Sequence, residues 1–120
     1  MGNYTEFRDR GQIHPDNLFS GEFPRVMEKV TLESGKYQKG TILGKIKSTQ
    51  KYVPLNLSAE DGSQIPEAIL AEDVESGSEV EAIIYLTGEF NASSLVVNSG
   101  SDVASMRDAL RAKSIFIKNN

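Results

Sequence analysis

The fold class is decided by the stretch VTLESGKYQKGTILGKI at residues 30–46. Val30 and Leu32 alternate with polar residues, which is the period of a half-buried strand. A second apolar run at residues 41–43 follows a glycine. Glycines inside a strand pattern mark bulges, sharp bends or close approaches of two backbones. The stretch therefore predicts two short strands in a strongly bent ribbon, with structural bends at Gly35, Gly40 and Gly44.

Three more segments of the central region carry strand patterns. Residues 51–55 predict a short strand, which we expect at a sheet edge because Pro54 has no N–H to donate to a ladder. Residues 68–71 form an apolar run typical of a short buried strand. The longest pattern, residues 80–90, has apolar residues on both faces and is expected to bend at Gly88. Such a strand is either central or has one face turned to a neighbouring subunit.

The C-terminal part of the chain predicts short helices and a last strand. Asn91 is a favourable N-cap for one or two helical turns. A second helix is expected over residues 103–112, and residues 114–118 form the final strand. Residues 26–120 are therefore expected to form one mainly β domain with one or two short C-terminal helices.

The N-terminal segment, residues 1–25, has a different character from the rest of the chain. Its apolar side chains occur singly among glycine and proline, without helical or strand period. Burial of such single side chains does not offset the entropy lost when the segment is ordered. The segment is therefore either a flexible tail or an extended arm that orders on a partner. Its aromatic residues favour the arm, because disordered segments are poor in aromatics and interfaces are rich in them. The candidate partner-binding residues are Tyr4, Phe7, Ile13, His14, Leu18, Phe19 and Phe23.

Composition excludes several classes of function. The chain has 120 residues, a net charge of -4 and 13 scattered Lys and Arg residues, so the concentrated basic face that nucleic-acid binding needs is missing. There is no cysteine, which excludes disulfides, thiolate metal sites and a cysteine nucleophile. No apolar run reaches the ~18 residues of a membrane span. We expect a soluble protein made in a cytoplasm.

The residue types used in catalysis form no catalytic pattern. His14 is the only histidine, and it lies in the segment expected to be mobile, where no residue orients it. The densest acidic cluster (Glu72, Asp73, Glu75, Glu79 and Glu81) suits a hard cation but lacks the spacing of a calcium loop. A solvated acidic edge that prevents strand aggregation is the favoured interpretation. No catalytic residue, cofactor or metal is therefore predicted.

An ordered series of short motifs runs from about residue 26 to residue 118. After the first strand it comprises Gly35, residues 40–44, residues 51–54, Asp61-Gly62, residues 68–74 and residues 88–91. The order of these motifs resembles that of the phage head decoration proteins of the lambda type. Members of that family tend to have glycine where this chain has Ser114.

The resemblance implies a β-clip fold and a viral structural protein rather than an enzyme. It implies a homotrimer seated at threefold or quasi-threefold positions on the outside of the expanded phage head, as part of the virion. The partner there is the major capsid protein, which the N-terminal arm would grip. The implied role is to stabilise the head against the pressure of packaged DNA.

Two rival interpretations remain open from the sequence. One is another phage structural or adhesion module, in the tail, baseplate or surface, which would bind a host glycan or tail protein and not heads. The other is a trimeric enzyme on a β-clip scaffold, such as a nucleotide pyrophosphatase. That class needs a glycine-rich C-terminal segment over the nucleotide, and this chain has no glycine after Gly100.

Overall fold

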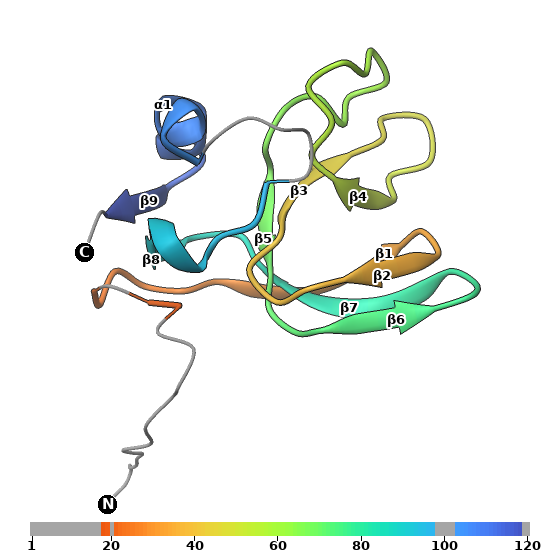
Figure 1. The fold of residues 1–120 in the computed structure, drawn as a ribbon, viewed down its shortest axis with the longest axis horizontal. Coiled ribbons are helices and arrows are strands. Elements are labelled where there is room, and N and C mark those ends of the chain that lie inside the picture. The colour runs from red at the N-terminus through yellow and green to blue at the C-terminus, as the bar shows by residue number, and fades with distance from the viewer. Residues whose placement is uncertain (1–17, 20, 98–102, 119–120) are drawn as a thin grey trace, which may run out of the picture.

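The computed structural model describes residues 18–19, 21–97 and 103–118, and these residues form a mainly β protein (Figure 1). Five strands close a small barrel in the order β1-β4-β3-β5-β7. These barrel strands are β1 (Met27–Leu32), β3 (Ile42–Lys45), β4 (Tyr52–Pro54), β5 (Ala68–Leu70) and β7 (Val80–Tyr85). The mainly β class predicted from the sequence is confirmed, whereas the β-clip architecture stays a prediction.

A long ribbon of the barrel turns back on itself at one end of the molecule. β1 and β7 pair antiparallel over their whole lengths. A short turn connects β1 to β2 (Gly35–Tyr37), and another connects β6 (Val74–Ser76) to β7. β2 and β6 form a second antiparallel pair. Figure 1 shows both turns at the same end of the molecule.

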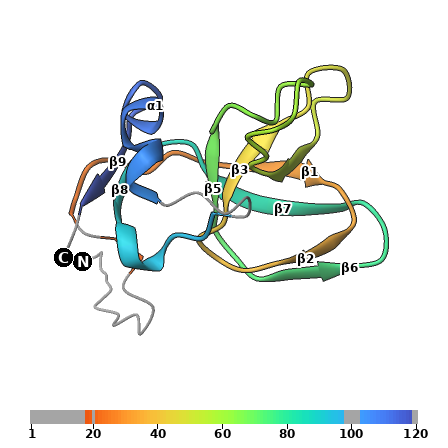
Figure 2. The same ribbon diagram turned by 45° about the horizontal axis from the view of Figure 1, so that its top comes forward.

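A second module lies beside the barrel, at the opposite end from these turns (Figures 1 and 2). Its sheet is the parallel pair of β8 (Gly88–Asn91) and β9 (Ile115–Lys118). Two 3-10 helices, Ala92–Ser94 and Val103–Met106, and one short α-helix, α1 (Arg107–Arg111), connect these strands. The predicted C-terminal helices are thus present: the first is a short 3-10 helix, and the second is a 3-10 helix followed directly by α1.

Two hydrophobic clusters stabilise this arrangement. The inner cluster fills the barrel and consists of Leu32, Leu43, Tyr52, Ala68, Leu70, Ala82 and Ile84. The outer cluster joins the barrel to the second module and consists of Leu18, Ile42, Leu55, Ile69, Tyr85, Phe90, Leu95, Met106, Leu110, Ile115 and Ile117. Successive residues of β3, β5 and β7 enter the two clusters alternately, because neighbouring side chains in a strand point to opposite faces. The apolar residues on both faces of β7 therefore indicate a central strand within this chain.

Two expectations about individual strands were wrong. β4 is not an edge strand, since it lies between β1 and β3 in the closed barrel. Its contact with β1 is the single pair Leu32 and Tyr52, so Pro54 lies beyond that ladder and its missing N–H leaves no gap there. The predicted strand at residues 80–90 is two strands, because β7 ends at Tyr85 and β8 begins at Gly88 with a φ of +151°.

The glycines of the central stretch lie where backbones turn or approach closely. A Cβ at Gly44, within β3, would lie 2.7 Å from the Cα of Ser63, so only glycine fits against that loop. Gly40 has a φ of +93° and precedes β3, while Gly35 begins β2.

Candidate functional site

The described part of the N-terminal segment lies across the second module. We call residues 18–26 the strap; Ser20 within it lies outside the described residues. Leu18 begins the strap and is 2% exposed, in the outer cluster. Its carbonyl oxygen accepts a hydrogen bond from the Asn91 N–H at 2.8 Å. The strap therefore starts inside the hydrophobic core of its own chain.

Aromatic contacts hold the first part of the strap. Phe19 forms an isolated antiparallel bridge with Phe90 of β8. Its ring lies edge-on to that of Tyr85, with the centroids 5.1 Å apart, and 5.5 Å from that of Phe90. The Arg25 guanidinium lies 3.6 Å from the centroid of the Phe19 ring, which adds a cation–π contact. Phe19 is thus enclosed by its own domain and by the strap itself.

A carboxylate of β8 holds the middle of the strap. Glu89 accepts a hydrogen bond from the Phe23 N–H at 2.8 Å and pairs with Lys118 of β9 at 3.1 Å. The bond from Phe23, and after it the bond from Lys118, lowers the pKa of Glu89 below its ordinary value. The Phe23 ring packs edge-on against Phe116, with centroids 4.8 Å apart. The strap is therefore connected to both strands of the module.

The end of the strap is held by Thr87, just before β8. Its hydroxyl donates to the Pro24 carbonyl oxygen at 2.7 Å and accepts from the Val26 N–H at 3.0 Å. The Leu86 N–H then donates to the Val26 carbonyl oxygen at 2.7 Å, where the β1–β7 ladder begins. The chain passes from the strap directly into the barrel.

The predicted arm residues fall into two groups. Leu18, Phe19 and Phe23 lie together on the domain's own surface and core, as described above. The other four lie outside the described residues: Tyr4, Phe7, Ile13 and His14. A capsid-binding role of this second group stays a prediction.

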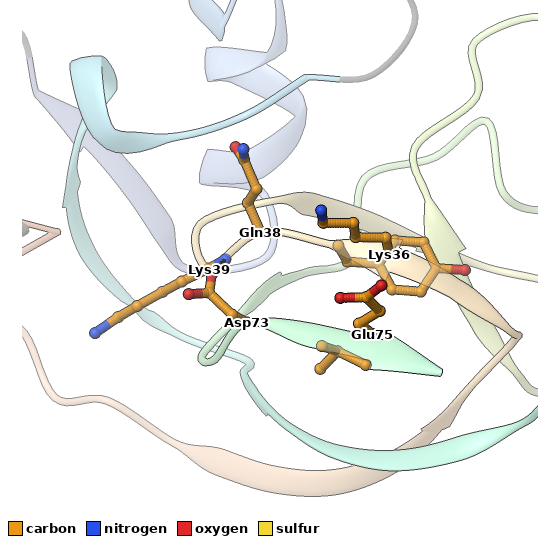
Figure 3. Close-up of a pocket in the computed structure, with 7 residues that line it drawn as sticks. Lys36, Gln38, Lys39, Asp73 and Glu75 are labelled. Carbon is orange, nitrogen blue, oxygen red and sulfur yellow. Dashed lines mark hydrogen bonds between the residues drawn. The ribbon is translucent and has the colours of Figure 1, made fainter. Parts of the chain in front are cut away.

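A shallow hollow of about 640 Å³ lies at the other end of the molecule, on the β2–β6 ribbon (Figure 3). It is lined by charged and polar side chains from the two sides of the ribbon, with Lys36 above Glu75. The backbone N–H of Lys39 donates to the Asp73 carboxylate at 2.7 Å, which fastens the two sides together. Burial, and then the nearby Glu33, raises the pKa of Tyr37 at this hollow. The contacts at this hollow hold the β2–β6 ribbon together, as expected for a two-stranded ribbon at the protein surface.

Members of the acidic cluster have separate partners instead of converging on one point. Glu72 accepts from the Ile83 N–H at 2.8 Å, Glu79 pairs with Lys51, and Glu81 lies 3.9 Å from Lys29. In the described ranges, no group of His, Asp or Glu side chains is arranged to hold a metal ion. A helix long and apolar enough to cross a membrane is likewise missing from those ranges.

Together, the closed barrel and the extended strap laid over its side module define a small β-barrel protein with an N-terminal segment anchored at Leu18. The sequence model of the family described as "Bacteriophage lambda head decoration protein D" matches residues 11–115, and the chain belongs to this family. The family is structural and is not a family of enzymes; it places the protein in the capsid of the phage virion. A search of curated proteins found no match.

Sequence reasoning missed Glu89 and Thr87, which hold the strap. Both are polar residues in a strand pattern, and such residues usually face solvent. The available signal was the pair of aromatic residues at positions 19 and 23, which identified the strap but not the surface that it covers.

Proposed function

We propose that this protein binds the outer surface of the expanded phage head as a homotrimer at threefold or quasi-threefold positions and stabilises the DNA-filled head. The observation that carries the proposal is the family match over residues 11–115. The partner is the major capsid protein, and the contact is made by the arm, whose anchors are Tyr4, Phe7, Ile13 and His14.

In this proposal the arm comprises residues 1–17, because the described part of the strap that follows lies on the chain's own domain. Leu18, Phe19 and Phe23 are in contact with the chain's own domain and are used there. The residues before Leu18 keep two aromatic side chains, Tyr4 and Phe7, of the kind that interfaces bury as anchors. Three arms on one trimer raise the avidity by about 10²–10⁴-fold when all three reach their sites together. Binding would then depend on the expanded spacing of the capsid.

Exposed apolar side chains on the domain supply candidate positions for contacts between subunits or with the shell. Among the described residues, the large hydrophobic side chains left most exposed are Val26, Met27, Leu57 and Ile65, at 40–56%. Val26 is the last residue of the strap and Met27 begins β1, so a neighbour that contacts them lies where the strap enters the barrel.

The test is to mix the protein with expanded, undecorated heads and to count the bound copies per head after sedimentation. The wild-type chain should bind saturably. The full-length double variant Tyr4→Ser, Phe7→Ser should bind at least about tenfold more weakly, because each lost anchor removes about 2 kcal/mol of burial. Ile65→Ser removes one of the exposed apolar side chains of the domain and measures, in the same assay, how much a domain contact contributes to head binding.

Each outcome of this experiment has a definite meaning. Failure of the wild-type chain to bind expanded heads would refute the decoration function for that capsid. Equal binding by the double variant and the wild type would move the contact from the arm to the domain. Analytical ultracentrifugation of the free and head-released protein would test the homotrimer separately.

A further inference from the structure

The strap is fastened differently at its ends and in its middle. At the ends the strap is held by backbone hydrogen bonds: the Asn91 N–H donates to the Leu18 carbonyl oxygen, and the Leu86 N–H donates to the Val26 carbonyl oxygen. Between these ends the strap backbone also bonds to side chains: the Thr87 hydroxyl donates to the Pro24 carbonyl oxygen, Glu89 accepts from the Phe23 N–H, and the Asn91 Nδ2 donates to the Phe19 carbonyl oxygen at 3.3 Å. The middle of the strap is therefore held by a few side chains, besides the single bridge between Phe19 and Phe90.

The sequence of the strap explains why a ladder does not form there. Pro24 has no N–H to donate. Gly21 passes so close to β8 that a Cβ at this position would lie 2.6 Å from the carboxyl carbon of Glu89. The strap thus leaves strand geometry and bends around the Glu89 side chain, which takes the place of a ladder partner.

Glu89 has the features of a fastening point. Its side chain is 19% exposed, and it joins three elements: the strap through Phe23, its own strand β8, and β9 through Lys118. Hydrogen bonds to an ionised acceptor are about twice as strong as bonds between neutral groups. Loss of this one carboxylate removes the bond on Phe23 and leaves Lys118 without this ion pair.

We propose that Glu89 is a positioning residue for capsid binding: it latches the strap onto β8, with Thr87 as the second fastening, and so fixes the place and direction from which the arm leaves the domain. The inference rests on the proposed function of the arm. A fixed root reduces the entropy lost when the arm binds, and preorganisation of this kind increases affinity without a new contact.

The experiment uses the full-length chain and measures two properties. The first is backbone amide exchange, residue by residue, in the free protein. Glu89→Ala should speed exchange at Phe23 by at least about tenfold, the effect expected for loss of a bond to a charged acceptor. Amides in the centre of the β1–β7 ladder, such as Val30, should keep their rates. Glu89→Gln retains an acceptor oxygen and should restore most of the protection.

Thr87 provides an independent pair of variants on the same strap. Thr87→Val keeps the shape of the side chain but loses the hydroxyl, so exchange at Val26 should rise by about tenfold. Thr87→Ser keeps the hydroxyl and should resemble the wild type. Glu60→Ala removes an exposed carboxylate from a loop remote from the strap in sequence and is the control for a change in net charge.

The second property is affinity for expanded heads. Glu89→Ala and Thr87→Val should bind at least about tenfold more weakly, and Glu89→Gln should bind nearly as well as the wild type. Faster exchange throughout the domain would overturn the latch, because it would show a general loss of stability. Faster exchange confined to the strap with unchanged head binding would overturn the positioning role.

The two proposals fail in different ways. If the wild-type protein does not bind heads, the decoration function fails, and the exchange rates alone decide whether Glu89 latches the strap. If Phe23 exchanges equally fast with and without the carboxylate, the latch is refuted whatever the heads show.

Discussion

Ser114 has a backbone conformation that its residue type disfavours. Its φ is +63°, in the left-handed region, at the point where the chain leaves α1 and enters β9. The Ser114 N–H donates to the Arg111 carbonyl oxygen at 3.0 Å, and its carbonyl oxygen accepts from the Gly88 N–H at 3.2 Å. These bonds hold the residue in place although a left-handed conformation costs a non-glycine residue about 1–2 kcal/mol.

We predict that Ser114→Gly stabilises the protein. Glycine adopts this φ without strain, and after subtraction of its greater freedom in the unfolded chain the gain should be about 0.5–1 kcal/mol. Urea denaturation measures the change. Ser58→Gly is the control, because Ser58 is not among the residues with positive φ and should lose stability on the same substitution. A loss of equal size at both positions would contradict the prediction.

At the scale of elements, the sequence predicted the strands that carry a clear apolar pattern. The alternation at Val30 and Leu32 and the runs at residues 68–71 and 80–85 correspond to β1, β5 and β7. β2 and β6 were missed because their residues, Gly-Lys-Tyr and Val-Glu-Ser, contain no apolar run like the one that marks β5, a strand of the same length. Their pairing depends on the ribbon's reversal, which is a property of tertiary structure.

The candidate site was predicted only in part, for a related reason. Phe19 and Phe23 were recognised as anchors by their residue type, but residue type does not reveal which surface an anchor contacts. Phe23 and Glu89 are 66 positions apart, so no local pattern joins them. The N-cap predicted at Asn91 was likewise correct only in position. Asn91 precedes the 3-10 helix, but its side chain donates to the Phe19 carbonyl oxygen instead of capping the helix.

The attachment of the strap should depend on pH through Glu89. The bond from Phe23 lowers the pKa of Glu89 in the folded protein. The stabilisation that ionised Glu89 gives to the strap is therefore complete above the ordinary glutamate pKa of about 4.3, and it is lost as the pH falls through the lowered pKa. The charged residues beside it are Lys118 on β9, Arg107 and Arg111 on α1, and Glu22 on the strap.

The measurement is the protection of the Phe23 amide as a function of pH, corrected for intrinsic exchange. Protection should be constant above the ordinary glutamate pKa and should fall as the pH drops through the lowered pKa of Glu89. Glu89→Gln, which has no charge to lose, should show no such fall. An identical fall in this variant would show that a group other than Glu89 causes the effect.

At the scale of the whole molecule, Leu18 connects the N-terminal segment to the rest of the fold. It shares the outer cluster with residues of the barrel, such as Ile69, and of the second module, such as Leu110 and Ile115. The strap is therefore part of the structure that joins the two modules, whereas the sequence suggested that the domain begins at residue 26.

We predict that Leu18→Ala destabilises the protein by about 2–5 kcal/mol, the usual cost of a cavity left by a fully buried leucine. Leu57→Ala, at a side chain that is 40% exposed, is the matched control and should cost less than about 1 kcal/mol. Thermal or chemical unfolding measures both. Similar small losses of stability in both variants would show that Leu18 contributes little to the core. Removal of residues 1–25 would then leave the domain stable and could be used to test the arm.

The position of the strap also sets the order of events during synthesis. The residues of the strap are translated early, but their seat is built from β8 and β9, and the Phe23–Glu89 contact closes a loop of 66 residues. Long-range contacts of this kind form slowly, because the chain between them must be closed first. β9 follows the other elements of the described fold in sequence, so the strap reaches its place only after β9 has left the ribosome. A nascent chain thus has no seat for the strap until both strands of the second module have been made.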